Sequence, residues 1–238
     1  HQLRDILLAD LKNPVVITGA VARVGVQGMG GIGKSVLAAA LARDPEVRRI
    51  FTDGIFWISI RQHPNLVEIQ RQTVKLLGGD SVFEDIQTGK ARLQEILEHR
   101  SVLLVLDDVW HAADADAFDV VGMKSKLLLT TRDAGLVTSF AGTSYQVQLP
   151  SLPEASALLA AAARVPLNIL PPVAEEIIEE CGRLPLALSL CGGMQYKGQS
   201  WERILRMLRE KRIELIPDRQ ETDETHRSIW QTMEVSVS

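Results

Sequence analysis

The 238-residue sequence has few cysteines, few aromatic residues and no long hydrophobic run. Its two cysteines, Cys181 and Cys191, lie in an apolar stretch without metal-ligand spacing. They predict buried thiols in a reducing compartment rather than a disulfide. No apolar run approaches the length that spans a bilayer, and no signal peptide is visible. We therefore expect a cytoplasmic protein that has no membrane partner.

The sequence also has no large excess of positive or negative charge. The sequence has 26 Lys and Arg against 30 Asp and Glu, which gives a net charge of −4 and argues against nucleic acid as a main partner. The arginine-rich residues 201–212 place Trp201, Ile204, Leu205 and Leu208 on one helical face. This pattern favours a helix that packs on a core over one that reads DNA. The five histidines show no zinc-binding or triad spacing.

Residues 28–35 match the phosphate-binding pattern G-x-x-x-x-G-K-[ST], between a strand-like alternation and a strong helix former. The glycines let successive backbone N–H groups point at one anion, and the helix N-terminus adds partial positive charge. We expect Lys34 to reach the outer phosphates and the Ser35 hydroxyl to ligate Mg²⁺. The predicted nucleotide-binding residues here are Gly28, Met29, Gly30, Gly31, Ile32, Gly33, Lys34, Ser35 and Val36.

Strands and helices alternate over residues 1–150. Several runs are unbroken Val, Ile and Leu, which is typical of parallel strands buried on both faces. We predict an α/β fold in which a parallel P-loop sheet is covered by helices on both faces. The expected strands are 15–19, 21–26, 54–60, 102–106, 126–130 and 145–149, and the expected helices are 1–12, 36–42, 64–77 and 88–99.

Residues 151–213 contain no strand-like run and are predicted to form a small all-helical domain. Its expected helices are 153–163, 171–181, 186–194 and 201–212. The start of the remaining segment, 214–238, is polar and acidic, as expected of a linker, and its end begins a further element. Because the chain begins without Met and stops within that element, we expect it to be a piece of a longer protein.

Charged residues follow two of the predicted strands. Ligands bind at the carboxyl ends of strands in open α/β sheets, and Asp107 and Asp108 come directly after the strand 102–106. We assign Asp107 to Mg²⁺, partly through water, and Asp108 to the base that orients the attacking water. Arg132 follows the next strand and is placed to reach a terminal phosphate. The predicted catalytic residues are thus Asp107, Asp108 and Arg132, and the predicted magnesium ligands are Ser35 and Asp107.

A weaker signal lies in the helical part, where Gly182-Arg-Leu-Pro-Leu-Ala-Leu-Ser189 joins two helices. Pro185 and Ser189 are four residues apart and share one helix face. An apolar ring and a hydroxyl in that arrangement suit a lid over a nucleotide, although proline at a helix start also has a purely structural explanation.

Four segments stand in a fixed order: 28–35, Leu-Leu-Val-Leu-Asp-Asp-Val-Trp (103–110), Leu-Leu-Leu-Thr-Thr-Arg-Asp (127–133) and Gly-Arg-Leu-Pro-Leu-Ala-Leu (182–188). In this order the chain resembles the NB-ARC family of STAND P-loop NTPases over about residues 20–210. That family includes plant resistance proteins, apoptotic-protease activating factors and bacterial relatives. The resemblance implies an ASCE-type sheet, an ARC1-like helical domain at 151–213 and the start of a truncated winged-helix domain within 214–238. It also implies that Pro185 contacts adenine and that Ser189 makes a polar contact.

The resemblance implies an ADP/ATP switch in a larger signalling protein. ADP would hold a closed form, exchange for ATP would permit self-association, and effector and sensor domains would lie outside this chain. Hydrolysis with Mg²⁺ is expected to be slow, because Asp108 is shorter than the Glu of many P-loop motors. Two segments typical of the family, Val-Gly-Arg and Met-His-Asp, have no match here, which leaves the affinity for ADP and the autoinhibition open.

Two other functional classes compete with the switch. An active P-loop ATPase motor acting on DNA or protein is the main alternative. A GTPase or small-molecule kinase is the other, but no lysine is followed two residues later by Asp, as guanine recognition requires, and no kinase acceptor signal is evident.

Overall fold

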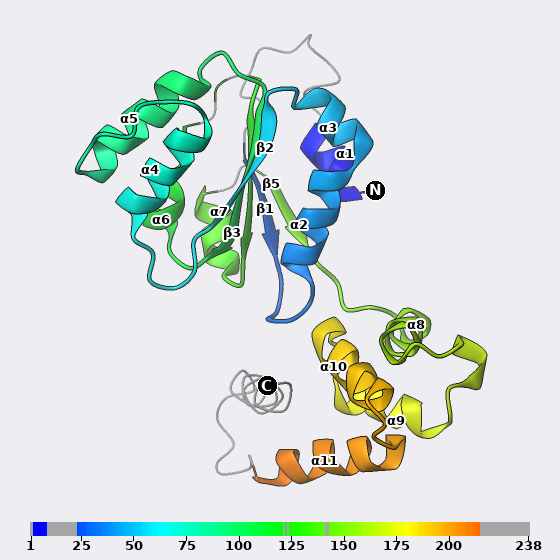
Figure 1. The fold of residues 1–238 in the computed structure, drawn as a ribbon. Coiled ribbons are helices and arrows are strands. Elements are labelled where there is room, and N and C mark those ends of the chain that lie inside the picture. Colours follow the sequence, from blue (N-terminus) through cyan, green and yellow to red (C-terminus); the bar gives the residue numbers. More distant parts are fainter. Residues whose placement is uncertain (1, 9–22, 121, 123, 141–142, 215–238) are drawn as a thin grey trace. The chain divides into compact units, whose positions relative to one another are not determined.

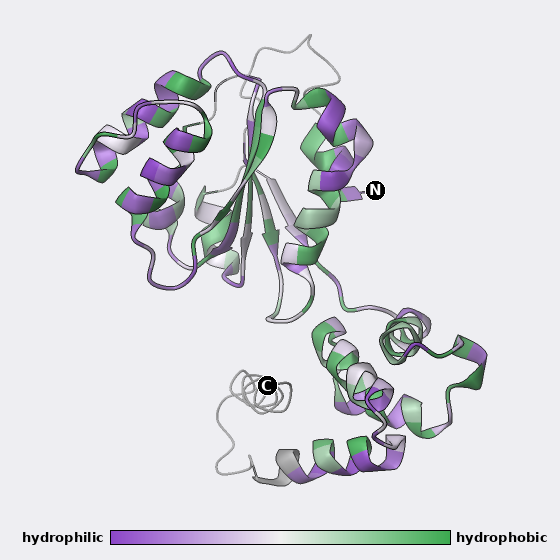
Figure 2. Ribbon diagram, in the orientation of Figure 1, coloured by the Kyte–Doolittle hydropathy of each residue, from purple (hydrophilic) through white to green (hydrophobic). Residues whose placement is uncertain are grey.

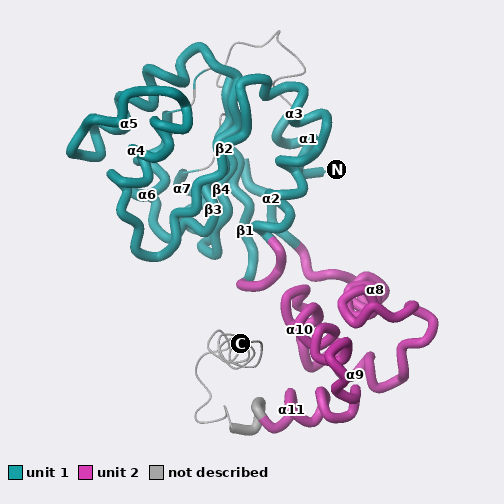
Figure 3. Tube along the Cα trace, viewed as in Figure 1, with its two compact units in different colours: residues 1–29, 34–147 teal, residues 30–33, 148–238 magenta. Residues whose placement is uncertain are grey.

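The computed structural model describes residues 2–8, 23–120, 122, 124–140 and 143–214. The predicted strand 15–19, the end of the predicted helix 1–12 and nearly all of the segment 214–238 lie outside these residues. The chain forms two compact units, one of residues 1–29 and 34–147, the other of residues 30–33 and 148–238 (Figure 3).

The first unit is built on a five-stranded sheet in the order β2-β3-β4-β1-β5, and every neighbouring pair is parallel (Figure 1). This confirms the predicted parallel P-loop sheet. The strands are β1 (Arg23–Gln27), β2 (Gly54–Ser59), β3 (Val102–Val109), β4 (Lys126–Thr131) and β5 (Thr143–Gln146).

Helices cover both faces of this sheet, as predicted (Figure 1). They are α1 (Gln2–Leu8), α2 (Lys34–Arg43), α3 (Pro45–Ile50), α4 (Leu66–Leu76), α5 (Ile86–Leu97), α6 (Ala112–Asp116) and α7 (Ala134–Phe140). Helices α1, α2 and α3 pack on one face, and α4 to α7 on the other. In Figure 2, α4 and α5 carry both hydrophilic and hydrophobic segments, as expected of helices with one face on a core.

The alternation of side chains along β3 explains why its apolar run is unbroken. Leu104 and Leu106 enter the core beneath α4 and α5, whereas Leu103 and Val105 enter the core beneath α1 and α2. Successive residues of a strand point to opposite faces, so a strand covered on both sides must be apolar at every position. Leu103 to Leu106 are fully buried.

Three short helices, α3, α6 and α7, were not expected from the sequence, because they are too short to show a period. Helix α3 depends on capping instead: Asp44 Oδ1 accepts hydrogen bonds from the backbone N–H of Glu46 (2.8 Å) and Val47 (3.3 Å), and Pro45 opens the helix. Strand β5 also ends earlier than the expected 145–149. The Val147 N–H still donates to the Gln27 carbonyl at 2.9 Å, but no strand continues beyond it.

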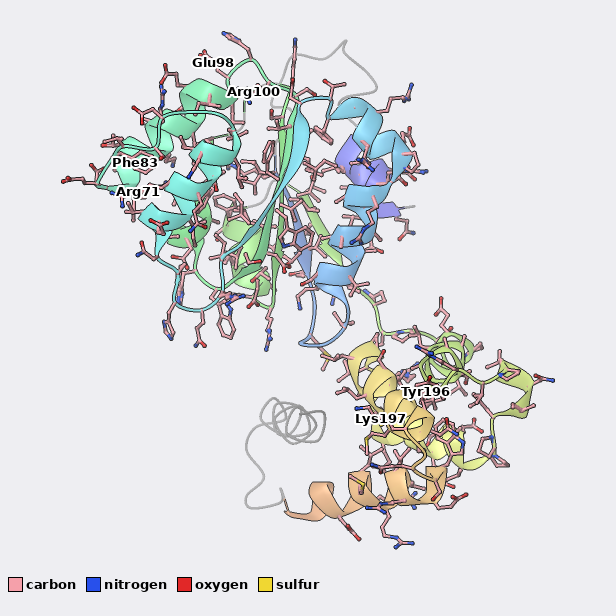
Figure 4. The ribbon with its side chains drawn as sticks, in the orientation of Figure 1. Arg71, Phe83, Glu98, Arg100, Tyr196 and Lys197 are labelled. Atoms are coloured by element: carbon pink, nitrogen blue, oxygen red, sulfur yellow. The ribbon has the colours of Figure 1, made fainter. Side chains whose placement is uncertain are left out.

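The segment after α4 is held to that helix by an arginine. Arg71 Nε donates to the Phe83 carbonyl at 2.9 Å, and its guanidinium lies 5.8 Å from the centroid of the Phe83 ring (Figure 4). Arg71 therefore anchors the approach to α5 through both charge and ring contact. This side of the sheet contributes packing to the unit and holds none of the predicted site residues.

The second unit is helical, with α8 (Leu152–Ala163), a short 3₁₀ turn (Leu167–Ile169), α9 (Val173–Glu180), α10 (Pro185–Tyr196) and α11 (Trp201–Glu214). A capping box of Ser151 and Glu154 begins α8. The four helices enclose one core, in which Leu159, Ile177 and Leu188 are fully buried. The all-helical part that the sequence predicts is thus present.

Helices α8 and α10 approach closely at Gly192. A Cβ on this residue would lie 2.5 Å from Ala162 Cβ and 2.8 Å from the Leu159 carbonyl oxygen. The neighbouring core holds Cys181 and Cys191 as free, buried thiols whose Sγ atoms are 3.6 Å apart, as the sequence predicted. Among the described helices, none is both long and apolar enough to cross a membrane.

Candidate nucleotide-binding site

The segment that matches the phosphate-binding pattern joins β1 to α2. Gly31 and Gly33 adopt φ values of 74° and 101°, which residues with a side chain rarely adopt. Lys34 starts α2, and its Nζ donates to the carbonyls of Gly28 (2.7 Å) and Met29 (2.9 Å). The ammonium thus lies against its own loop, and one of its three N–H donors remains for an anion.

The environment of Lys34 is unusual for a lysine, since the residue is only 9 % exposed. Burial, with a contribution from the positive charge of Arg132, lowers the pKa of Lys34 to about 8. The carboxylates of Asp108 and Asp107 oppose this shift. Three charged residues named in the sequence analysis therefore act on Lys34, although they come from two other segments of the chain.

Asp107 lies near the end of β3, where the sequence places it. Its Oδ1 accepts a hydrogen bond from Ser35 Oγ at 2.7 Å. The structure thus brings together the two residues that the sequence predicts as magnesium ligands, which are 72 positions apart. The pair fits Mg²⁺, which prefers oxygen donors and is usually held by one or two carboxylates together with phosphate oxygens and waters.

A larger cage of metal ligands is missing from the described residues, where no group of three or more His, Cys, Asp or Glu side chains could hold a metal ion. Zinc and other metals that require several such ligands therefore have no site in that part of the chain. A hydroxyl and a carboxylate beside a phosphate-binding loop are sufficient for an ion that arrives with a nucleotide.

Thr130 on β4 is a member of the site to which the sequence analysis gave no role. Its hydroxyl donates to Asp107 Oδ1 at 2.6 Å and accepts a hydrogen bond from the Asp108 N–H at 3.0 Å. Thr130 is 1 % exposed, so water does not compete for these bonds. The sequence showed only that Thr130 follows the all-leucine run 127–129, because the pairing of this strand with β3 is not visible in it.

The backbone around Asp108 is irregular. Asp108 has a φ of 57°, in the left-handed region, and the pairing of β3 with β4 shifts register between Leu106 and Val109. Strain of this kind persists only where neighbouring contacts fix it. The hydrogen bond from the Asp108 N–H to Thr130 is one such contact. The second acid of the site thus stands on a bulge rather than on a regular strand.

Arg132 follows β4 and is exposed. Its guanidinium lies 5.4 Å from the centroid of the Trp110 ring, at the end of the neighbouring strand β3. The turn that carries it is fixed on its C-terminal side, where Thr131 Oγ1 accepts from the Asp133 N–H at 3.1 Å and Asp133 Oδ1 accepts from the Gly135 N–H at 2.7 Å. Sequence reasoning gave Trp110 no role.

The remaining predicted nucleotide contacts differ in exposure. Met29 and Val36 are 42 % and 73 % exposed, whereas Ile32 is buried. Gly30 lies between Met29 and Gly31 in the same loop. Their proposed contacts with a nucleotide stay predictions.

Pro185 and Ser189 belong to the second unit, in the first turns of α10. Ser189 Oγ donates to the Pro185 carbonyl at 2.8 Å, so the predicted shared face exists. The serine hydroxyl is satisfied by its own helix, as is common for serine in helices. The roles of Pro185 and Ser189 as nucleotide contacts stay predictions.

Comparison with known proteins adds independent evidence. The sequence profile of the NB-ARC domain matches residues 7–165. The chain is 32% identical over 230 residues to apoptotic protease-activating factor 1 of Danio rerio, and the match covers 90% of this chain and 18% of that protein. It is 28% identical over 210 residues to disease resistance RPP8-like protein 3 of Arabidopsis thaliana, with 82% of this chain and 23% of that protein covered. The chain thus spans about a fifth of the length of these relatives.

Solved structures share the fold at lower identity. A STAND protein with a tetratricopeptide repeat sensor from Pyrococcus horikoshii matches with a TM-score of 0.53 and 17% identity, over 87% of this chain and 32% of that chain. PCH-2 of C. elegans matches with a TM-score of 0.54 and 16% identity, over 88% and 67% of the two chains. The profile match covers well over half of the sequence, and the sheet carries the expected P-loop and acids. The chain belongs to the NB-ARC family of STAND P-loop NTPases.

Proposed function

We propose that this chain is the ADP/ATP-binding switch module of a larger signalling protein. The observation that carries the proposal is the contact of Ser35 with Asp107 beside the P-loop lysine. It places the hydroxyl and the carboxylate that a nucleotide-bound Mg²⁺ requires next to a cation for the phosphates. Membership of the NB-ARC family supports a nucleotide site here over an incidental polar cluster.

Within this site each charged group has a distinct task. Lys34 and the loop N–H groups bind the phosphates, and the N-terminus of α2 favours their negative charge. Ser35 and Asp107 hold Mg²⁺, which would neutralise charge on the phosphates. Asp108 orients a water, and its short side chain on a bulged strand makes hydrolysis slow compared with the typical enzyme rate of about 10 per second.

Adenine is the expected base. The guanine-recognition pattern is missing from the sequence, and the NB-ARC family, to which the chain belongs, implies adenine. We assign Pro185 to the adenine ring and Ser189 to a polar contact, as the family resemblance implies. That contact would require the Ser189 hydroxyl to leave or share its bond with the Pro185 carbonyl.

The switch would act through the difference between the two nucleotides. A ligand shifts a conformational equilibrium only by its differential contacts with the two states. Among the residues that the structure describes, we assign this contact with a γ-phosphate to Arg132. Its side chain is exposed, and its charge acts on Lys34. ADP would hold the inactive form, and ATP would permit self-association of the full-length protein, whose effector and sensor domains lie outside this chain.

The first prediction concerns Arg132→Ala. A charge-assisted hydrogen bond to the γ-phosphate contributes about 1.5 to 3 kcal/mol, so the variant should lose roughly 10- to 150-fold in ATP affinity and much less in ADP affinity. Calorimetric titration with both nucleotides measures the ratio. Arg49→Ala is the matched control, because this exposed arginine lies on α3, beyond the far end of α2 from the P-loop. An equal loss for both nucleotides would leave the γ-phosphate without a sensor.

A second prediction follows from the lowered pKa of Lys34. The charged form binds phosphate, so ADP affinity should fall as the pH rises above about 8, by up to about tenfold per pH unit toward the lysine's usual pKa near 10.5. Binding raises this pKa, and proton uptake should therefore appear when titrations near pH 8 are compared in two buffers of different ionisation enthalpy. Lys34→Arg stays charged throughout and should show no such fall. A flat wild-type profile between pH 7 and 10 would contradict the role of Lys34.

The third prediction tests Thr130. Thr130→Val removes both hydrogen bonds while keeping the shape, so Asp107 loses its orientation toward Ser35. The gain in ADP affinity on adding Mg²⁺, relative to excess EDTA, should shrink by about two- to tenfold. Thr130→Ser keeps the hydroxyl and should retain the gain. If the valine variant responds to Mg²⁺ like the wild type, Thr130 has only a structural role.

A further inference from the structure

The surroundings of Arg132 are unusual for an exposed arginine. It is near enough to Lys34 to lower the pKa of that lysine, so two cations stand close together at one end of the sheet. Within the part of the chain that the structure describes, Arg132 makes no ion pair or hydrogen bond, although Asp107 and Asp108 belong to the same site. Its guanidinium lies over the face of the Trp110 ring, 5.4 Å from the ring centroid.

Trp110 sits where β3 ends, between the buried Val109 and His111, the residue that precedes α6. Its indole Nε1 is buried and has no hydrogen-bond partner among the described residues. A buried donor without a partner lowers stability, and such groups in native structures need an explanation. No described group accepts a hydrogen bond from the indole N–H, whereas the ring face contacts the guanidinium of Arg132.

A guanidinium that lies over an aromatic face keeps its N–H groups free, because they point outward in the plane of the group. The ring contact is therefore compatible with donation to a phosphate oxygen. An arginine side chain loses considerable rotamer freedom when it is fixed, and a ring that restrains it beforehand reduces that loss on binding. Trp is also the aromatic residue with the strongest attraction for a cation.

We propose that Trp110 is a positioning residue for Arg132, whose guanidinium it holds at the carboxyl end of the sheet so that ATP is preferred over ADP. The inference rests on the proposed function, in which Arg132 contacts the γ-phosphate. The ring holds Arg132 without an anionic partner, which would otherwise compete with the phosphate for its donors. Neither Asp107 nor Asp108 is then neutralised by the arginine.

The test is a double-mutant cycle read as the ratio of ATP to ADP affinity. Trp110→Leu should lower this ratio by about two- to fivefold, the effect of an exposed cation–ring contact. In the Arg132→Ala background, Trp110→Leu should have no effect on the ratio. Trp110→Phe should lower the ratio less than the leucine variant, because it keeps a ring. Its thermal unfolding midpoint should be no lower than that of the wild type, because the unpartnered N–H is removed.

The cycle separates the two proposals. If Arg132→Ala is selective against ATP but both Trp110 variants keep the wild-type ratio, the positioning role is overturned while the sensor role stands. A selective loss that persists in the Arg132→Ala background also overturns it, because the ring would then act through another group. If Arg132→Ala weakens both nucleotides equally, the sensor role is overturned and the positioning role with it. If Trp110→Leu fails to fold, the ratio of ATP to ADP affinity of Trp110→Phe tests the positioning role instead.

Discussion

The parallel pairing of β3 with β4 and of β4 with β1 brings three strand ends to one edge of the sheet. The four charged groups of the site stand near these ends: Lys34 at the start of α2, after the loop that follows β1, Asp107 and Asp108 on β3, and Arg132 directly after β4. The Ser35–Asp107 bond then ties the first turn of α2, the helix that follows β1, to β3. In the sheet, β4 lies between β1 and β3. None of the segments that the structure describes supplies Lys34, Asp107 and Arg132 together, so the proposed site depends on this pairing.

The charges that result are balanced but not paired. Arg132 and the two carboxylates all act on the charge of Lys34, yet Lys34 donates to backbone carbonyls and Arg132 faces a ring. Direct ion pairs would occupy the donors that a phosphate needs. Two features of the site are unfavourable for the protein alone: the pKa of Lys34 is lowered, and the backbone of Asp108 is left-handed. Strain and unusual ionisation concentrated at one edge of a sheet are typical of a binding site.

The sequence was sufficient for the parts of the site that depend on local pattern. The P-loop is contiguous, and the end of an apolar strand places Asp107 at the ligand-binding edge of any parallel sheet. Thr130 was not predictable in the same way, because its role depends on the register of β3 against β4 and on a bulge that no local pattern shows. The contact of Trp110 with Arg132 could not be predicted either, because it depends on which strand neighbours β3 in the sheet. Helices α3 and α7 were missed because short helices depend on caps such as Asp44 and Asp133 rather than on periodicity.

The central claim is that this sheet edge binds an adenine nucleotide, and the nucleotide carried by the purified protein tests it most directly. The protein is denatured, the supernatant is separated by ion exchange, and the bound species is identified against standards. We expect ADP or ATP in the wild type and none in Lys34→Ala, since an ammonium among phosphate oxygens contributes a large part of the affinity. A guanine nucleotide, or a wild-type protein that neither carries nor binds adenine nucleotide, would contradict the account.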